Sequence, residues 1–195
     1  MRGIRKWQAD KMRRIGNENR KKKRNKKVHI ASRVAVFGML TALAMILSYV
    51  ETLIPISLGI PGVKPGLANL AVFTALYMTT PANAFGISMV RILLTAFTFG
   101  NLYSMLYSLA GGILSFLLML LCKKKDWLNK TGVSIVGGVS HNLGQLAVAA
   151  AVVENTAVFA YFPMLLLAGT AAGTLIGLLG ALILARLPKN LFFTS

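Results

Sequence analysis

The sequence predicts an all-α polytopic membrane protein, a bundle of six transmembrane helices. Hydrophobic residues make up 55% of the 195 positions, and the mean hydropathy is +0.64. Only 14% of the residues are charged, against about 25% in a typical soluble domain. Between Val34 and Ala185 the apolar sequence is almost continuous. A soluble fold would have to hide six long apolar helices that have almost no polar face.

Composition divides the chain into three parts. Residues 1–32 are polar and basic, and we expect them to form a disordered cytoplasmic tail. Residues 33–187 form the expected six-helix transmembrane domain, and residues 188–195 form a short cytoplasmic C-terminal tail. The N-terminal segment does not resemble a cleaved signal peptide, because its basic region is too long and the next apolar run is long enough to span a membrane.

The first span is expected at 33–51, and a connection rich in proline and glycine follows it. Pro55, Pro61 and Pro65 make this connection rigid and non-helical. Later breaks come from Pro81, from Gly100 with Asn101, from the segments KKKDWLNK and ENTAV, and from Pro188. The remaining spans are therefore expected at 66–80, 83–99, 102–122, 132–153 and 158–186.

The distribution of positive charge predicts how these spans are oriented. Six spans place both termini on one side, and 20 of the 22 Lys and Arg residues then fall on that side. Lys64 alone is left for the other side, and Arg91 lies within the membrane. By the positive-inside rule, we expect a multi-pass plasma membrane protein with cytoplasmic termini and an outward-facing 51–65 loop. A basic tail next to a membrane helix predicts attraction to anionic lipids, and we expect no nucleic-acid partner.

Arg91 lies in the middle of an apolar block, NAFGISMVRILLTAFTFG. An ionised guanidinium in hydrocarbon costs several kcal/mol at least, so it should face the protein interior or a water-filled cavity. The other polar residues expected at depth are Asn69, His141, Asn142 and Gln145. The spacing of four residues places His141 and Gln145 on one helix face.

Two interpretations of these polar groups remain open. They could form hydrogen bonds between helices, or they could line a ligand site together with Arg91. Glu51 and Lys64 of the outer loop could line or gate that site, with Lys64 acting in a lid. Lys64, Arg91 and a protonatable His141 would favour an anionic or strongly polar ligand.

Several kinds of catalytic site have no counterpart in the sequence. It contains no phosphate-binding loop of the ATPase type. Asp10 and Asp126 are the only aspartates, so the chain cannot supply the aspartate cluster that holds magnesium in a prenyl diphosphate synthase. Cys122 is the only cysteine and cannot form a disulfide framework or a cysteine metal site. We therefore expect no metal, no cofactor and no catalysis by this chain alone.

Small residues recur at helical spacing in the first and last spans. They are Ala31, Ala35, Gly38 and Ala42 in the first, and Gly169, Gly173 and Gly177 in the last. Such stripes let helices approach closely. They predict either packing within the bundle or a docking face for another membrane protein.

The motifs VETLIPI, GVKPGLANL, YSLAGGILS and SHNLGQL, together with the Arg91 helix, resemble the family called heptaprenyl diphosphate synthase component I, or Gx transporter family. The resemblance covers about residues 33–187. This family is grouped with the substrate-binding S components of energy-coupling-factor transporters. The resemblance implies an outward-facing pocket capped by the loop after the first helix. It also implies that Ala31, Ala35, Gly38 and Ala42 dock a membrane coupling protein that works with two ATPases.

Three functions are compatible with the sequence. The first is the substrate-binding membrane subunit of a small-molecule importer, with a pocket lined or gated by Glu51, Lys64, Asn69, Arg91, His141, Asn142 and Gln145. The second is a non-catalytic accessory subunit that anchors a soluble polyprenyl diphosphate synthase through the basic tail, and its ligand could be related to isoprenoids or quinones. The third is a membrane-embedded enzyme that uses His141.

Overall fold

The computed structural model describes residues 2–53, 66–188 and 191, and in these residues every regular element is helical. The elements in chain order are α1 (Arg2–Leu53), α2 (Asn69–Met78), α3 (Pro81–Phe99), α4 (Leu102–Lys125), α5 (Lys130–Val153), the 3-10 turn η1 (Thr156–Tyr161) and α6 (Phe162–Arg186). The predicted all-α class is confirmed for the described part of the chain. The chain separates into two units, Met1–Val36 and Phe37–Ser195, and each is described by itself.

The described residues contain five helices that are long and apolar enough to cross a membrane. These are Ile30–Glu51, Pro81–Phe99, Leu102–Lys125, Lys130–Val153 and Thr156–Arg186. This agrees with the prediction of a membrane protein but not with six full-length spans. The expected span at 66–80 is replaced by α2, whose 10 residues cover about 15 Å, or half of a hydrocarbon core.

The late start of α2 has a local cause. Gly66 adopts a φ of +84°, which lies in the left-handed region and cannot continue a right-handed helix. The backbone N–H groups of Asn69 and Leu70 donate to the carbonyls of Gly66 and Leu67 in a tight turn, and the helix begins only after it. Hydropathy alone does not register this turn, because Leu67 and Ala68 are apolar.

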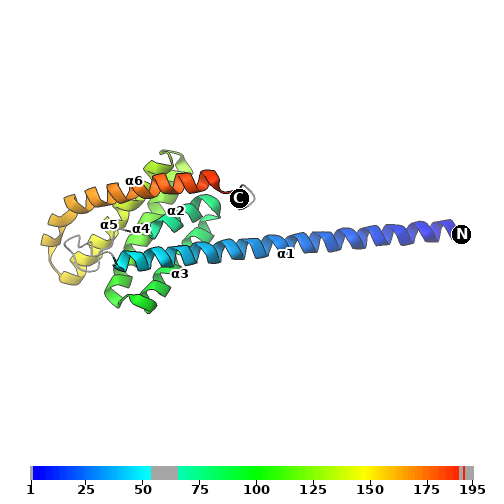
Figure 1. Cartoon of the computed structure of the whole chain (residues 1–195), viewed down its shortest axis with the longest axis horizontal. Coiled ribbons are helices and arrows are strands. Elements are labelled where there is room, and N and C mark those ends of the chain that lie inside the picture. The colour runs from blue at the N-terminus through cyan, green and yellow to red at the C-terminus, as the bar shows by residue number, and fades with distance from the viewer. Residues whose placement is uncertain (1, 54–65, 189–190, 192–195) are drawn as a thin grey trace. The chain divides into compact units, whose positions relative to one another are not determined.

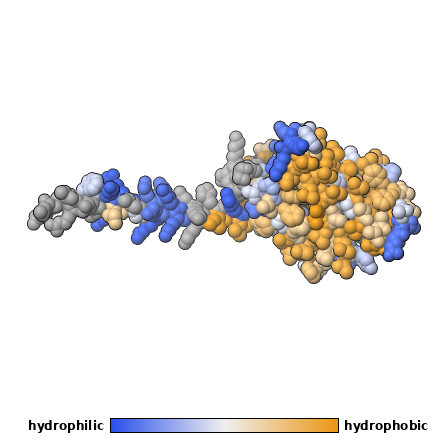
Figure 2. Space-filling view, turned by 180° about the vertical axis from the view of Figure 1, so that it is seen from behind, coloured by the Kyte–Doolittle hydropathy of each residue, from blue (hydrophilic) through white to orange (hydrophobic). Residues whose placement is uncertain are grey.

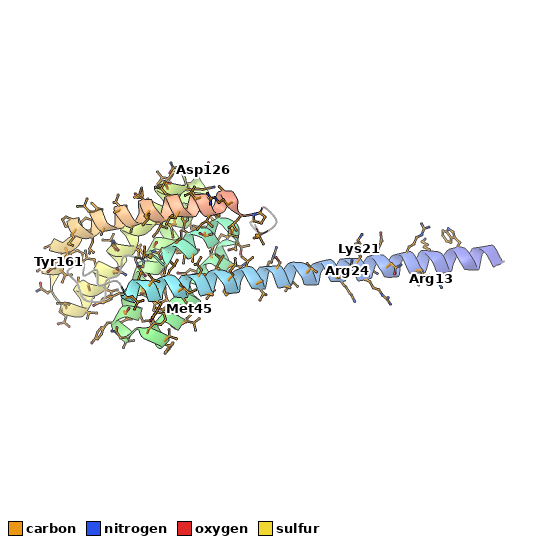
Figure 3. All side chains as sticks on the ribbon, in the orientation of Figure 1. Arg13, Lys21, Arg24, Met45, Asp126 and Tyr161 are labelled. Carbon is orange, nitrogen blue, oxygen red and sulfur yellow. The ribbon has the colours of Figure 1, made fainter. Side chains whose placement is uncertain are left out.

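The N-terminal unit is helical from Arg2, whereas we expected residues 1–32 to form a disordered tail. The segment contains no proline and is rich in Lys and Arg, whose unbranched side chains have good helix propensity. Arg13, Lys21 and Arg24 project away from the helix axis (Figure 3) and are exposed. Residues 20–24 are five consecutive exposed basic residues, so they point to all sides of the helix and not to one face.

In the second unit α5 is the central element. It packs against α4 on one side and α6 on the other, while α3 contacts both α2 and α4 (Figure 1). Many large apolar side chains of this unit are exposed, including Phe97, Leu117 and Leu167. Figure 2 shows the resulting hydrophobic surface on one face of the unit. Such a surface fits lipid contact and not a water-exposed domain.

The glycine stripe of α6 forms a packing seam against α5. A Cβ atom at Gly173 would lie 2.6 Å from the Cα of Ile135, and one at Gly177 would lie 2.8 Å from the Cα of Thr131. Gly169 similarly faces the backbone of Val139. For these three glycines, packing within the bundle is confirmed.

The small residues of α1 differ from this seam because all four are exposed. Ala31 and Ala35 are exposed in the first unit, and Gly38 and Ala42 are exposed in the second. A Cβ atom at Gly38 would meet no atom within 4 Å. Their expected role in docking a partner stays a prediction.

Polar caps fix the predicted breaks between helices. The side chains of Thr80, Asn101 and Asn129 accept hydrogen bonds from backbone N–H groups in the first turns of α3, α4 and α5. Asp126, after α4, and Tyr161, before α6, mark opposite ends of the bundle (Figure 3). The turns that these residues flank therefore belong to opposite ends of the spans.

Candidate functional site: a polar cavity inside the bundle

A small cavity lies inside the second unit, among α1, α3, α4 and α5. Its volume is about 10 Å³, which is enough for about one water molecule. The lining is mostly polar and consists of Ser48, Glu51, Gly66, Arg91, Ile92, Thr95, Ser108, His141 and Gln145. A polar interior cavity is unusual in a protein whose outer surface is apolar, so it is the candidate ligand site.

Helical periodicity brings the lining residues together. On α1 the buried positions Leu40, Ala44, Ser48 and Glu51 recur every three or four residues and form one inward face. On α3 Arg91 and Thr95 lie four residues apart on the buried face. The functional side chains are thus the polar members of stripes that otherwise form the core.

Arg91 is the central charged group of the cavity, and only 5% of its surface is exposed. Its Nη1 donates a hydrogen bond of 3.4 Å to the hydroxyl of Ser48. Among the residues that the structure describes, Nε and Nη2 have no hydrogen-bond partner. These two nitrogens form one side of the planar guanidinium, the side that grips a carboxylate or phosphate with two parallel hydrogen bonds.

Glu51 supplies the opposite charge at the last turn of α1. It is 6% exposed, and its Oε1 accepts a hydrogen bond of 2.5 Å from the backbone N–H of Leu67. Its carboxylate is electrostatically coupled to Arg91. Glu51 therefore both balances the charge of Arg91 and holds the turn that precedes α2.

His141 and Gln145 form a hydrogen-bonded pair on one face of α5, with 3.0 Å between their Nε2 atoms. An amide nitrogen can only donate, so in this arrangement Nε2 of His141 is the acceptor. Gly111 lets the imidazole approach α4, since a Cβ there would lie 2.9 Å from Nδ1. Gln145 lines the cavity, and its carbonyl oxygen has no partner among the described residues.

The structure brings four of the predicted site residues together at the cavity. Glu51, Arg91, His141 and Gln145 all line the cavity. Asn69 does not line it but lies beside it, since a Cβ at Gly66 would lie 3.0 Å from Nδ2 of Asn69.

Of the remaining two predicted residues, the structure describes only Asn142. Asn142 points to α6, where its Nδ2 donates a hydrogen bond of 2.8 Å to the carbonyl of Leu165. It therefore joins two helices, as the first of our two interpretations expected. Lys64 and most of the loop from 51 to 65 lie outside the described residues.

The sequence analysis missed five lining residues, Ser48, Gly66, Ile92, Thr95 and Ser108. Two of them carry a signal: Ser48 lies three residues before Glu51, and Thr95 lies four residues after Arg91, so each shares a helix face with a predicted residue. Ser108 and Gly66 have no such neighbour. Ser108 reaches the cavity because of the way α4 packs, and Gly66 reaches it because of the turn before α2. Ile92 is apolar and is indistinguishable from an ordinary core residue.

The described lining of the cavity combines one cation, one anion, three hydroxyl groups, one imidazole and one side-chain amide. Among the described residues, no group of three or more His, Cys, Asp and Glu side chains is placed to hold a metal ion. The unpaired donors of Arg91 define the chemistry that the described residues offer most clearly, which is recognition of an anionic group.

Comparison with known proteins gives a family but no characterised relative. Neither a curated protein nor a solved structure matches the chain. The family described as heptaprenyl diphosphate synthase component I matches residues 40–183, which contain every described residue of the cavity. On this match the chain belongs to the heptaprenyl diphosphate synthase component I family.

Proposed function

We propose that this protein is the substrate-binding membrane subunit of a small-molecule importer, similar to the S components of energy-coupling-factor transporters. The observation that carries the proposal is the Nε–Nη2 side of Arg91, which faces an interior cavity and has no partner among the described residues. Leaving charged donors unsatisfied in the interior costs more than leaving neutral ones. A ligand with an anionic group would remove that cost when it binds.

The cavity has room for about one water molecule. A ligand would have to displace side chains of the lining. The contact between Glu51 and the N–H of Leu67 links the cavity to the connection that follows α1. This link supports a mechanism in which ligand binding and movement of that connection are coupled.

The distribution of charge supports an orientation with cytoplasmic termini. Lys123, Lys124 and Lys125 at the end of α4 and Arg186 at the end of α6 would then lie on the cytoplasmic side with the basic helix of the first unit. That helix would contact anionic lipid headgroups. Glu51 would lie toward the outside, where an importer captures its ligand.

The importer hypothesis requires partners, because the chain has no phosphate-binding loop of its own. We propose a transmembrane coupling protein and two ATPases. The exposed small residues Gly38 and Ala42 in the second unit, and Ala31 and Ala35 in the first, would allow close approach of a partner helix. Reorientation of the bundle against the coupling protein would then release the ligand inside.

The family description favours a second function, that of a non-catalytic accessory subunit of a heptaprenyl diphosphate synthase. In that case the chain would anchor a soluble polyprenyl diphosphate synthase at the membrane. The basic helix of the first unit is the natural contact, because the enzyme would approach from the cytoplasmic side. The cavity would then have a structural role or would bind a molecule related to isoprenoids or quinones.

An affinity pull-down from native membranes in mild detergent, read out by mass spectrometry, separates the two functions. Recovery of a coupling protein with two ATPases supports the importer. Recovery of a soluble polyprenyl diphosphate synthase without them supports the accessory subunit and contradicts the importer. Deleting residues 1–30 should release the synthase in the second case, but should leave transport nearly intact in the first.

A further inference from the structure

We propose that an anionic phospholipid binds where the ends of α2, α4 and α5 meet, with its phosphate between the side chains of Lys123 and Lys130. This site is separate from the cavity, whose lining contains neither lysine, and it does not depend on what the cavity binds. Three observations lead to it: two ammonium groups share one aromatic ring, the segment around them is strongly basic, and the site lies at the ends of membrane-spanning helices.

The ring of Tyr77 in α2 holds lysines from two other helices. The Nζ of Lys123, near the end of α4, lies 4.9 Å from the centre of the ring, and the Nζ of Lys130, the first residue of α5, lies 5.9 Å from it. Both distances are in the range of cation–π contacts. The ring therefore keeps two ammonium groups near each other although their charges repel.

The contacts of both lysines within the described residues are to neutral groups. Lys123 donates a hydrogen bond of 2.5 Å to the carbonyl of Leu76, and both lysines contact the ring of Tyr77. Leu76 lies in the last turn of α2, where carbonyls lack a partner within the helix, so this bond fixes the end of α2. Because an ammonium group has three N–H donors, each lysine keeps donors for an anion.

The segment 123–130, which joins α4 to α5, is basic. It contains four lysines and one acidic residue, Asp126. Asp126 is electrostatically coupled to Tyr77, but it offsets only one of the four positive charges. The exposed ring of Trp127 lies 4.9 Å from the Nζ of Lys125. Tryptophan and lysine side chains at the end of a spanning helix are typical of the lipid headgroup region.

The position of the lysine pair favours a phospholipid as the source of the anion. Lys123 lies near the end, and Lys130 at the start, of two helices of 24 residues each. Helices of this length cross the hydrocarbon core of a bilayer. The two lysines therefore lie at the level where lipid phosphate groups are concentrated, and basic sites between transmembrane helices at this level bind anionic headgroups.

A phospholipid bound in this position would join three helices. Tyr77 belongs to α2, Lys123 to α4 and Lys130 to α5. A phosphate between the two lysines would offset their repulsion and hold the ring between α4 and α5. The short α2 would thereby gain an anchor at its end, so the bound lipid should stabilise the folded protein.

Thermal unfolding and native mass spectrometry of the purified full-length protein in detergent test the inference. The probes are dioctanoyl phosphatidylglycerol, dioctanoyl phosphatidylcholine and inorganic phosphate, each titrated over the same range. We expect phosphatidylglycerol to raise the melting temperature by roughly 3 °C or more, and the other two probes to raise it by less than about 1 °C. Mass spectrometry should show phosphatidylglycerol retained on the protein.

Three variants make the test specific to the lysine pair. Lys130→Gln removes one ammonium group and leaves the bond of Lys123 to Leu76, so the Kd for phosphatidylglycerol should rise about fivefold. Lys130→Arg keeps the charge and should bind like the wild type. Lys124→Gln is the matched control, because it removes the same charge from an exposed position of the same segment, and its Kd should change less than about twofold. The basic helix of the first unit is the same in all variants, so its attraction to lipid cancels.

Equal weakening by Lys130→Gln and Lys124→Gln would overturn the site, because diffuse attraction to the whole segment would then explain the binding. Equal stabilisation by phosphatidylglycerol and phosphatidylcholine would overturn it as well. Binding of inorganic phosphate as tight as that of phosphatidylglycerol, and weakened by Lys130→Gln, would assign the lysine pair to a soluble anion and contradict the lipid.

Discussion

The α5–α6 seam and the polar cavity are both buried in the second unit, but their side chains differ in size and in charge. At the seam, Gly169, Gly173 and Gly177 remove side chains so that two backbones pack directly. The cavity instead contains the large, charged side chain of Arg91, whose Nε and Nη2 have no partner among the described residues. The seam is therefore explained by packing between two helices, whereas the cavity contains polar groups that the described contacts do not satisfy.

The two buried polar residues Asn142 and Arg91 show the same difference. The Nδ2 of Asn142 donates a hydrogen bond to the carbonyl of Leu165 across the helix interface, whereas its Oδ1 has no partner among the described residues. Arg91 donates one long hydrogen bond, to Ser48, and its Nε and Nη2 have no partner in the part of the chain that the structure describes. Burial of a polar group in a membrane protein therefore does not by itself indicate a ligand site, and what distinguishes Arg91 is that its unsatisfied donors carry a charge and line a cavity.

The largest effect should come from filling the seam. Gly173→Ala places a Cβ atom 2.6 Å from the Cα of Ile135, and we expect a loss of about 2–3 kcal/mol of stability, because the backbone cannot move aside. Thermal unfolding in detergent measures this loss. Gly38→Ala is the matched control, since no atom lies within 4 Å of the added carbon. Equal melting temperatures for the two variants would contradict the seam.

The second largest effect should come from replacing the guanidinium of Arg91 by a group with the same charge but without the two-nitrogen side. Arg91→Lys retains the balance with Glu51 but cannot form the two-nitrogen contact. We expect ligand affinity to fall by about 2 kcal/mol, roughly thirtyfold in Kd. The melting temperature without ligand should stay close to that of the wild type. Unchanged affinity would mean that only the charge of Arg91 matters.

Asn142→Ala should have a smaller effect, and it should change stability and not ligand affinity, the reverse of Arg91→Lys. It removes the hydrogen bond to Leu165, so we expect about 1 kcal/mol less stability. Ligand affinity should change less than twofold, because Asn142 does not line the cavity. Melting temperature and Kd measured on the same variant test this prediction. A large loss of affinity at constant stability would mean that Asn142 contacts the ligand.

The smallest effect should come from Lys123 at the far end of α4. Its Nζ donates to the carbonyl of Leu76 and lies 4.9 Å from the centre of the Tyr77 ring. Lys123→Met should lower stability by about 0.5–1 kcal/mol, because both contacts are only partly buried. The exposed neighbour Lys124, changed to Met, provides the control. If the two variants melt at the same temperature, the contacts of Lys123 with α2 contribute nothing.

The sequence predicts much of the fold because hydropathy and breakers act locally. Four later spans agree with α3 to α6 within a few residues. Pro81 is the first residue of α3, and Asn101 and Asn129 cap the starts of α4 and α5, so these boundaries depend on local sequence. The short α2 escaped prediction because its start depends on a left-handed turn at Gly66 among apolar residues. The helical first unit escaped it because composition alone does not separate a charged helix from a disordered tail.

The lining residues of the cavity could be predicted only where a polar residue stands out in an apolar segment. Arg91 stands out in an apolar block, and the spacing of His141 and Gln145 points to one helix face. Asn142 looks equally conspicuous but faces α6. Ser108 looks ordinary but lines the cavity. Which side of a buried helix faces which neighbour is decided by tertiary packing, and the periodicity of a fully apolar helix does not encode it.

The most direct test of the central claim is untargeted mass spectrometry of small molecules that co-purify with the full-length protein, wild type against Arg91→Lys. The account predicts that at least one small molecule with an anionic group is enriched on the wild type and depleted at least tenfold on the variant, at equal amounts of folded protein. The same molecules in the same amounts on both proteins would contradict the claim that the unpaired side of Arg91 is the ligand contact.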